Sequence, residues 1–427
     1  MRVMKDSGIA WIGEIPEEWN LRKIKYIFRI SSGTTPKSDN LEYWDGDIPW
    51  VTPADYKTEN EYIYHGRKFL SKAGLEAANL QLLPVNSIVL SKRAPIGAVA
   101  ITAAELTINQ GCIAGIPIDD CSVRYYYFIL SICTEQLNLL GSGTTFKELS
   151  AQDFGNFIVP TPDVAVQERI ADYLDRKCSQ IDAIIARQQE VIEKLKAYKL
   201  SVITEAVTKG LTPHAPMKDS GVEWIGEIPE QWETASISRV ATVVRGASPR
   251  PAGDPRYFNG QDVPWITVAE VTKDDGKYIF STESYLTKEG AECSRLVEKG
   301  TLLLSNSGAT LGVPKVTLIT GCINDGSVAF LDLNIEQMYL LYVFKSRTLE
   351  LRKQMQGYGQ PNLNTTIVKN IVVPLPHPDE QKSISEYLDK RCKAIDDTIE
   401  MKEKVVERLS KYKKSLIYEV VTGKKEV

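Results

Sequence analysis

Residues 5–19 read KDSGIAWIGEIPEEW, and residues 218–232 read KDSGVEWIGEIPEQW. The offset of 213 positions is half of the 427-residue chain, which is too long for the repeat of a solenoid. The repeat therefore predicts two copies of a whole domain. Two similar halves in one chain form a pseudo-dimer, and a pseudo-dimer suits a target that itself has two halves.

A second matched stretch leads into a long amphipathic helix in each copy. Residues 159–175 read VPTPDVAVQERIADYLD, and residues 373–389 read VPLPHPDEQKSISEYLD. Asp163 and Asp379 are the predicted helix caps. Apolar residues then recur at seven-residue steps, with one polar residue in the middle of each series, which predicts two helices that pair as an antiparallel coiled coil. The predicted pairing positions are Leu174, Ile181, Gln188, Leu195 and Val202, and Leu388, Ile395, Lys402, Leu409 and Leu416.

The remaining segments predict an α+β fold. Short runs rich in β-branched residues at 86–91, 157–162, 300–305 and 371–376 are typical of strands, and helices are expected at 125–140 and 337–355. We predict two pseudo-repeated domains at residues 1–163 and 214–378. Each is followed by a long helix, at 164–213 and 379–427. Each helix of roughly 40 residues would be about 60 Å long.

Composition gives few functional clues. The net charge is −4, and neither the globular parts nor the helices are basic overall, so any contact with nucleic acid must be made by local loops or with the help of a partner. The seven cysteines include no Cys-x-x-Cys pair, which indicates free thiols in a reducing cytoplasm. No signal peptide or membrane-spanning apolar run is recognised, and a cytoplasmic location is expected.

Motifs for catalysis are missing from the sequence. It lacks a phosphate-binding loop, a dinucleotide signature and a nucleophile elbow, and its three histidines are not paired at ligand spacing. Asp163, Asp175 and Lys177 formally match a nuclease pattern, but Asp175 and Lys177 point to different sides of a helix, and the second copy breaks the pattern. We therefore predict no catalytic residue and no metal site in this chain.

Candidate binding residues lie in three loops that differ between the copies. The framework around these loops matches, for example in Pro49-Trp50 and Pro264-Trp265. A shared scaffold with divergent loops suits two related but different targets, and these residue types can contact base edges and phosphates. The candidate DNA-binding residues are Thr34, Thr35, Lys37, Lys92, Arg93, Thr144, Thr145 and Lys147 in the first copy, and Arg245, Ser248, Arg250, Asn306, Ser307, Tyr358, Gln360 and Asn362 in the second.

The two matched stretches together resemble one known family, the specificity subunits of type I restriction–modification systems. The resemblance covers essentially the whole chain, with one small departure at Gln381-Lys382, where the family usually has Gln-Glu. It implies two target-recognition domains, each of which reads one half of a bipartite, asymmetric DNA site. It also implies that the helices set the spacing between the half-sites.

The resemblance further implies partners and cofactors. The helices would dock two methyltransferase subunits, and endonuclease–translocase subunits would complete the restriction complex on double-stranded DNA. S-adenosylmethionine, ATP and magnesium would bind the partner subunits and not this chain, which would be non-catalytic by itself. Two alternatives from the residues are a coiled-coil scaffold with two protein-binding domains, which would show no salt-dependent DNA affinity, and a self-contained nuclease.

Overall fold

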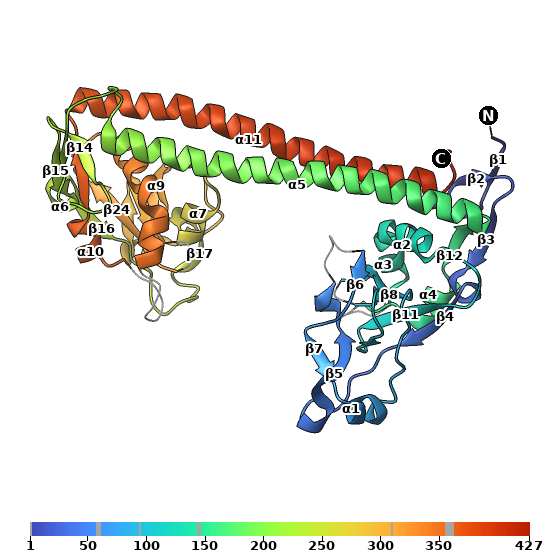
Figure 1. Cartoon of the computed structure of the whole chain (residues 1–427). Coiled ribbons are helices and arrows are strands. Elements are labelled where there is room, and N and C mark those ends of the chain that lie inside the picture. Colours follow the sequence, from blue (N-terminus) through green and yellow to red (C-terminus); the bar gives the residue numbers. More distant parts are fainter. Residues whose placement is uncertain (1, 57–60, 94, 143–146, 309–310, 355–362) are drawn as a thin grey trace. The chain divides into compact units, whose positions relative to one another are not determined.

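The computed structural model describes residues 2–56, 61–93, 95–142, 147–308, 311–354 and 363–427 (Figure 1). Two long helices divide the chain: α5, Val164–Lys209, and α11, Pro378–Val421. We call the chain before α5 the first region, and the chain between the two helices the second region. Among the described residues, no helix combines the length and apolar character that a membrane span requires.

In its described residues, the first region contains four sheets and four α-helices. Its largest sheet has the order β4-β11-β8-β9-β6, and a smaller one has the order β10-β5-β7. The strands are β1 Met4–Asp6, β2 Glu14–Pro16, β3 Asn20–Lys23, β4 Phe28–Ser32, β5 Trp44–Val51, β6 Tyr62–Ile63, β7 Lys68–Leu70, β8 Ile88–Ser91, β9 Val99–Thr102, β10 Thr107–Ile108, β11 Cys112–Pro117 and β12 Ile158–Thr161. The helices are α1 Lys72–Ala77, α2 Val123–Ile132, α3 Thr134–Leu140 and α4 Ala151–Asn156, with 3-10 turns η1 Ile24–Tyr26, η2 Leu41–Tyr43 and η3 Pro53–Asp55.

The second region repeats this topology. Its largest sheet, β16-β24-β21-β22-β18, matches the five-stranded sheet strand for strand, and β20 adds a fourth strand to the smaller sheet, β19-β17-β23-β20. The strands are β13 Met217–Asp219, β14 Glu227–Pro229, β15 Glu233–Ser236, β16 Thr242–Arg245, β17 Phe258–Ile266, β18 Tyr278–Ile279, β19 Tyr285–Leu286, β20 Arg295–Val297, β21 Leu302–Ser305, β22 Pro314–Thr317, β23 Gly321–Ile323, β24 Ser327–Leu331 and β25 Val372–Leu375. The helices are α6 Ile237–Val240, α7 Val268–Thr272, α8 Lys288–Glu292, α9 Gln337–Gln354 and α10 Thr365–Asn370.

The chain folds into two compact units, and each unit contains one end of both long helices. The first unit comprises Met1–Gln189 and Lys404–Val427, and the second comprises Glu190–Glu403. In the first unit Lys413 Nζ lies 2.6 Å from an oxygen of Asp182, and in the second Lys199 Nζ lies 2.7 Å from an oxygen of Asp396. From Asp182 to Lys199 the chain advances 17 residues along α5, whereas their partners on α11, Lys413 and Asp396, follow each other 17 residues in the opposite direction. The predicted antiparallel coiled coil is confirmed.

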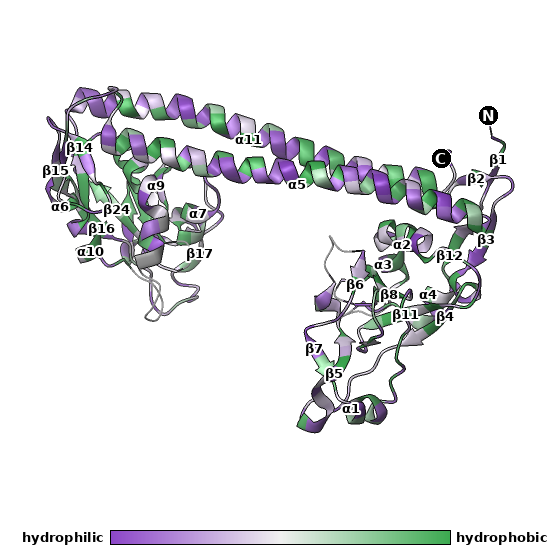
Figure 2. Ribbon diagram, in the orientation of Figure 1, coloured by the Kyte–Doolittle hydropathy of each residue, from purple (hydrophilic) through white to green (hydrophobic). Residues whose placement is uncertain are grey.

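The predicted pairing positions lie on the inner faces of the helices. Along both helices in Figure 2, hydrophobic residues alternate with hydrophilic ones, as an amphipathic helix requires. All ten positions are buried or half-buried, and the two central ones, Gln188 and Lys402, are half-buried. In the second unit Leu195 packs with Ile192, Ile395 and Ile399. The predicted domain boundaries at residues 163, 213 and 378 stay a prediction.

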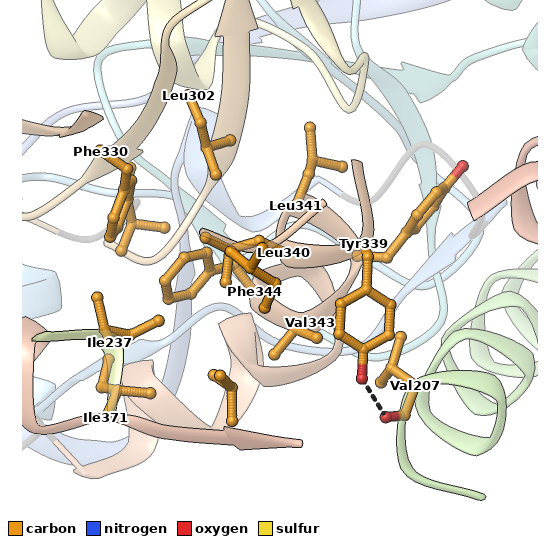
Figure 3. Packing of buried hydrophobic residues seen from close by; sticks show 14 of the residues in the cluster. Val207, Ile237, Leu302, Phe330, Tyr339, Leu340, Leu341, Val343, Phe344 and Ile371 are labelled. Carbon is orange, nitrogen blue, oxygen red and sulfur yellow. Dashed lines mark hydrogen bonds between the residues drawn. The ribbon is translucent and has the colours of Figure 1, made fainter. Parts of the chain in front are cut away.

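A buried tyrosine joins each globular region to the last turn of a helix. The Tyr339 hydroxyl donates to the carbonyl of Val207 at the end of α5, at 3.0 Å, within the core that Figure 3 shows. In the first unit the Tyr125 hydroxyl donates to the carbonyl of Val421 at the end of α11, at 3.1 Å. Both tyrosines are fully buried, where an unpaired donor would be costly, so these bonds fix where the helix end packs.

The matched stretches serve the same structural task in both copies. Gly8 and Gly221 have φ near +70°, a conformation that glycine adopts without strain, and each amide donates to the preceding aspartate, Asp6 or Asp219, at 2.9 Å. Further on, the Gln167 and Gln381 side chains each donate to a proline carbonyl at 2.8 Å. Each also accepts a backbone N–H from the residue that precedes a helix, Ser122 before α2 or Glu336 before α9. The repeat therefore fixes the hairpin and the junction between globule and helix.

Two predicted element boundaries were wrong. The predicted helix at 125–140 is two helices, α2 and α3, which break at Cys133. The second long helix begins at Pro378, so His377 and not Asp379 precedes it, and the His377 carbonyl accepts the first helical N–H bonds. Proline is favoured at the first helical position because it needs no N–H partner there. Asp379 therefore lies inside the first turn.

Candidate DNA-reading loops

Two of the three candidate loops of the first region are hydrogen-bonded to one turn, residues 109–112, which we call the first hub turn, and the segment after the third loop is bonded to the second loop. The Gly33 amide donates to the Cys112 carbonyl at 3.4 Å, and the Lys92 amide donates to the Gly111 carbonyl at 2.9 Å. The Leu149 amide, just beyond the third loop, donates to the Lys92 carbonyl at 2.9 Å. Backbone hydrogen bonds thus gather loops that lie far apart in the sequence.

The second region builds the same arrangement on residues 324–327, the second hub turn. The Gly246 amide donates to the Ser327 carbonyl at 3.0 Å, and the Asn306 amide donates to the Gly326 carbonyl at 2.9 Å. The Leu363 amide donates to the Asn306 carbonyl at 2.7 Å. Because every bond has its counterpart in the first region, the two domains share one loop scaffold although most of their loop residues differ.

Close packing explains one glycine in each scaffold. A Cβ atom built on Gly33 would lie 2.1 Å from the Ile108 carbonyl oxygen, and one built on Gly246 would lie 2.0 Å from the Asn324 carbonyl oxygen. The Ile108 oxygen adjoins the first hub turn and the Asn324 oxygen belongs to the second, and both are backbone atoms that cannot swing away. The first loop can therefore approach the hub turn only through glycine.

Side chains of the first region divide into exposed and tethered groups. Thr35, Lys37 and Lys147 are exposed, and Arg93 is half-buried. The Thr34 hydroxyl donates to the Ala78 carbonyl at 2.9 Å, so this side chain is tied to its own domain.

Lys92 forms an internal ion pair. Its Nζ lies 2.7 Å from Glu148 Oε1, and only 15% of the Lys92 side chain is exposed. The backbone of Glu148 exchanges two hydrogen bonds with Ser142, at 2.9 and 3.1 Å, which closes the base of the third loop. Lys92 thus braces two loops against each other. Sequence reasoning missed Glu148 because a carboxylate beside a predicted DNA contact gave no signal of its own.

In the second region three of the candidate residues converge on Asp325. Arg245 Nε donates to the Asp325 carbonyl at 3.0 Å, the Ser248 hydroxyl donates to its Oδ1 at 2.6 Å, and an Arg250 nitrogen lies 3.5 Å from its Oδ2. Asp325 was not among the predicted residues. The sequence did distinguish this position, because both hub turns contain Asn-x-Gly and the middle residue differs: it is Asp325 in the second copy and Gln110 in the first.

The remaining predicted residues lie deeper or outside the described ranges. The Asn306 side chain is fully buried, and Ser307 is half-buried. Burial raises the pKa of the Cys112 thiol in the first hub turn to about 12, so this thiol stays neutral near pH 7. Among the described residues, no three His, Cys, Asp or Glu side chains gather as a metal site would require. Thr144, Thr145, Tyr358, Gln360 and Asn362 lie outside the described residues.

The family model for the type I restriction modification DNA specificity domain matches this chain twice, at residues 16–194 and 229–408. The type I restriction enzyme MjaIX specificity subunit of Methanocaldococcus jannaschii is 30% identical over 87% of this chain and 86% of its own length. The MjaVIII specificity subunit of the same organism is 26% identical over 96% of this chain and 93% of its own length. Both alignments extend across the two domain copies of this chain.

Solved structures share the fold. A chain from work on complex assembly and conformational transition of the type I R-M system aligns with a TM-score of 0.74 at 16% identity, covering 95% of this chain and 98% of that chain. The HsdS subunit from Thermoanaerobacter tengcongensis aligns with a TM-score of 0.51 at 16% identity, covering 96% and 98%. With two family domains, two matched hub turns and a paired set of long helices, this chain belongs to the type I restriction–modification family, as a specificity subunit with two target-recognition domains.

Proposed function

We propose that each target-recognition domain reads one half of a bipartite DNA site, and that the two halves differ. The observation that supports this most directly is the pair of hub turns, which make corresponding backbone hydrogen bonds to loops with different side chains. The first scaffold presents Lys37, Arg93 and Lys147, and the second presents Arg245 and Arg250 around Asp325. Arginine and lysine provide both phosphate neutralisation and contacts to base edges.

We also propose that this chain sets where a partner acts without catalysing the reaction itself. The antiparallel helices would set the distance between the half-sites and dock two methyltransferase subunits, which would carry S-adenosylmethionine. Endonuclease–translocase subunits would bring ATP and magnesium. The absence of a recognised catalytic motif from the sequence is compatible with this division of labour.

The decisive experiment is a domain exchange in the assembled methyltransferase. Residues 20–160 are replaced by the matching segment of a relative with a different target, and methylated adenines are mapped genome-wide. Only one half of the recognition sequence should change, while the other half and the spacing stay the same. A change in both halves together would contradict independent reading. Absence of salt-dependent DNA binding by the assembled complex would favour the protein-scaffold alternative.

Point variants separate specificity from affinity. Arg250→Ala should relax the sequence only in the half-site read by the second domain if it contacts a base, at a cost of about 1–3 kcal/mol. Lys37→Ala is the matched variant of the first domain. If either side chain contacts only phosphate, its removal will instead weaken binding to all sequences and reduce the dependence on salt.

A further inference from the structure

The smaller sheets of the two domains carry matching pairs of aromatic side chains. In the first domain the Trp44 and Trp50 rings lie 5.1 Å apart, and in the second the Phe258 and Trp265 rings lie 5.0 Å apart. The register supports the match, because Trp44 and Phe258 each stand before a bulge and oppose a buried leucine. The two domains can therefore be compared at this place residue by residue.

In the first domain a cation of the chain itself lies over one ring of this aromatic pair. Lys68 lies opposite Trp50 in the sheet, and its Nζ lies 5.1 Å from the centre of the Trp44 ring. An ammonium group at this distance over an indole face is attracted by the ring quadrupole. Arg67 precedes it, so two cationic side chains stand at this strand.

The second domain replaces both cations. Ser284 occupies the place of Lys68, because its carbonyl accepts the Trp265 amide at 2.9 Å. The residues that follow also match: Tyr285 opposes Pro264, as Phe69 opposes Pro49 in the first domain. Glu283 correspondingly occupies the place of Arg67. Two positive charges thus become one negative charge and a hydroxyl, while the aromatic pair remains.

A cavity of about 650 Å³ lies at this place in the second domain. Its lining combines three aromatic rings with a carboxylate and small polar groups: Phe258, Gly260, Gln261, Trp265, Glu283, Ser284 and Tyr285. The cation–ring pairs that the described part of this domain does form use other rings, such as Tyr257, Tyr278 and Trp224. Glu283 is 87% exposed, and Lys273 lies 3.5 Å from it.

We propose that this aromatic pocket binds the cationic end of an arginine or lysine side chain presented by a partner protein. Lys68 is the internal counterpart of that ligand in the first domain. Aromatic faces with a carboxylate at the rim attract a guanidinium or ammonium group, whereas Glu283 repels a nucleic-acid phosphate. The inference concerns a protein contact and does not depend on how the loops read DNA.

The test uses the full chain and small probes. N-acetyl-arginine amide and N-acetyl-lysine amide are titrated by calorimetry and by saturation-transfer NMR, with N-acetyl-glutamine amide and adenosine monophosphate as neutral and nucleotide probes. The cationic probes should bind with a dissociation constant below about 10 mM, and the others more weakly. Stronger binding of the nucleotide, or no binding of the cationic probes, would overturn the proposal.

Three variants locate the site. Glu283→Gln should weaken binding of the cationic probes about threefold. Ser284→Lys should fill the pocket from within, as Lys68 does, and weaken binding at least about tenfold. Lys68→Ser should open the corresponding place in the first domain and add a second binding event. Unchanged binding by Ser284→Lys, with an unfolding temperature equal to that of the parent chain, would contradict the proposed pocket.

Discussion

Asp175 and Asp389 occupy the same position on α5 and α11, yet each is neutralised by a different part of its domain. Asp175 accepts a hydrogen bond from Arg124 of helix α2, which also donates to Asp172 at 2.7 Å. Asp389 accepts from Lys277, just before strand β18, at 2.6 Å, and from the Tyr342 hydroxyl at 2.5 Å.

The exchange can be followed at a single backbone position. Glu61 and Lys277 both accept, through their carbonyls, an amide of the neighbouring strand at 2.8 Å, so they are structural counterparts. The second domain has the cation of Lys277 at this position, and the first has the carboxyl of Glu61. Arg124 therefore neutralises Asp175 in the first domain. Burial, and next the nearby Asp175, raise the pKa of Glu61 to about 7. The repeat therefore fixes the helix carboxylate, while each domain provides its own charge balance.

Substitution of a feature that both domains share should destabilise both units equally, and the largest loss of stability is expected at the hub turns. Gly33→Ala and Gly246→Ala would each force a methyl group into a backbone carbonyl, and each should destabilise its own unit by more than about 3 kcal/mol. Calorimetric unfolding of the full chain measures this as a lowered transition temperature. Gly155→Ala, where a Cβ atom would meet only ordinary contacts at 3.4 Å and beyond, is the tolerated control. Tolerance of Gly246→Ala alone would show that the two scaffolds are not equivalent.

The two junction carboxylates, Asp389 and Asp175, should differ strongly in how much each contributes to the stability of its unit. Asp389→Ala would leave the Tyr342 hydroxyl and the Lys277 ammonium without their acceptor, at a cost of about 2–3 kcal/mol. Asp175→Ala would leave Arg124 its bond to Asp172 and relieve the repulsion of Glu61, so it should cost less than about 1 kcal/mol. Unfolding temperatures of the two variants at pH 7.5 provide the comparison. Equal losses would mean that the two junctions are balanced in the same way.

Glu61 should make the first unit sensitive to pH, through a carboxyl at the position where the second unit has Lys277. Because its folded pKa is raised from 4.5 to about 7, its favourable contribution is present below about pH 4.5 and is lost as the pH rises through about 7. Glu61→Gln should therefore stabilise the first unit by about 1–2 kcal/mol at pH 8 and have little effect at pH 4.5. A stability difference that does not change between these pH values would exclude this role for Glu61.

The smallest expected effect concerns the two buried tryptophans of the repeat. Trp232 Nε1 donates to Glu380 at 2.8 Å, whereas Val166 stands at that position in the first copy, and Trp19 Nε1 is buried without a described partner. Glu380→Val should cost about 1 kcal/mol, and Val166→Glu should stabilise the first unit by up to about 1 kcal/mol. Hydrogen-exchange protection of the two indole N–H groups reports on both bonds. A loss of stability in Val166→Glu would mean that the carboxylate cannot reach Trp19.

The sequence alone was sufficient to predict the two-copy architecture, four of the strands (β8, β12, β21 and β25) and the antiparallel helices. Repeats and heptads are local patterns, and burial of an apolar stripe leaves a long helix few choices other than pairing. The same local patterns could not show that α2 and α3 break at Cys133, because both segments are apolar at helical spacing and the break follows from packing in the core.

Only the tertiary structure decided which loop side chains are available. Lys92 and Arg93 are neighbours in the sequence, but Lys92 is held by Glu148, 56 positions away, through the register of the hub turn. Asp325 likewise became part of the site because the fold brings residues 245–250 beside residue 325. The type of a residue and its position in a motif specify what its side chain can bind. The partner that the side chain finds depends on the strand register between segments that are distant in the sequence. The sequence therefore determined the scaffold and its duplication, and tertiary packing determined the partner of each charge.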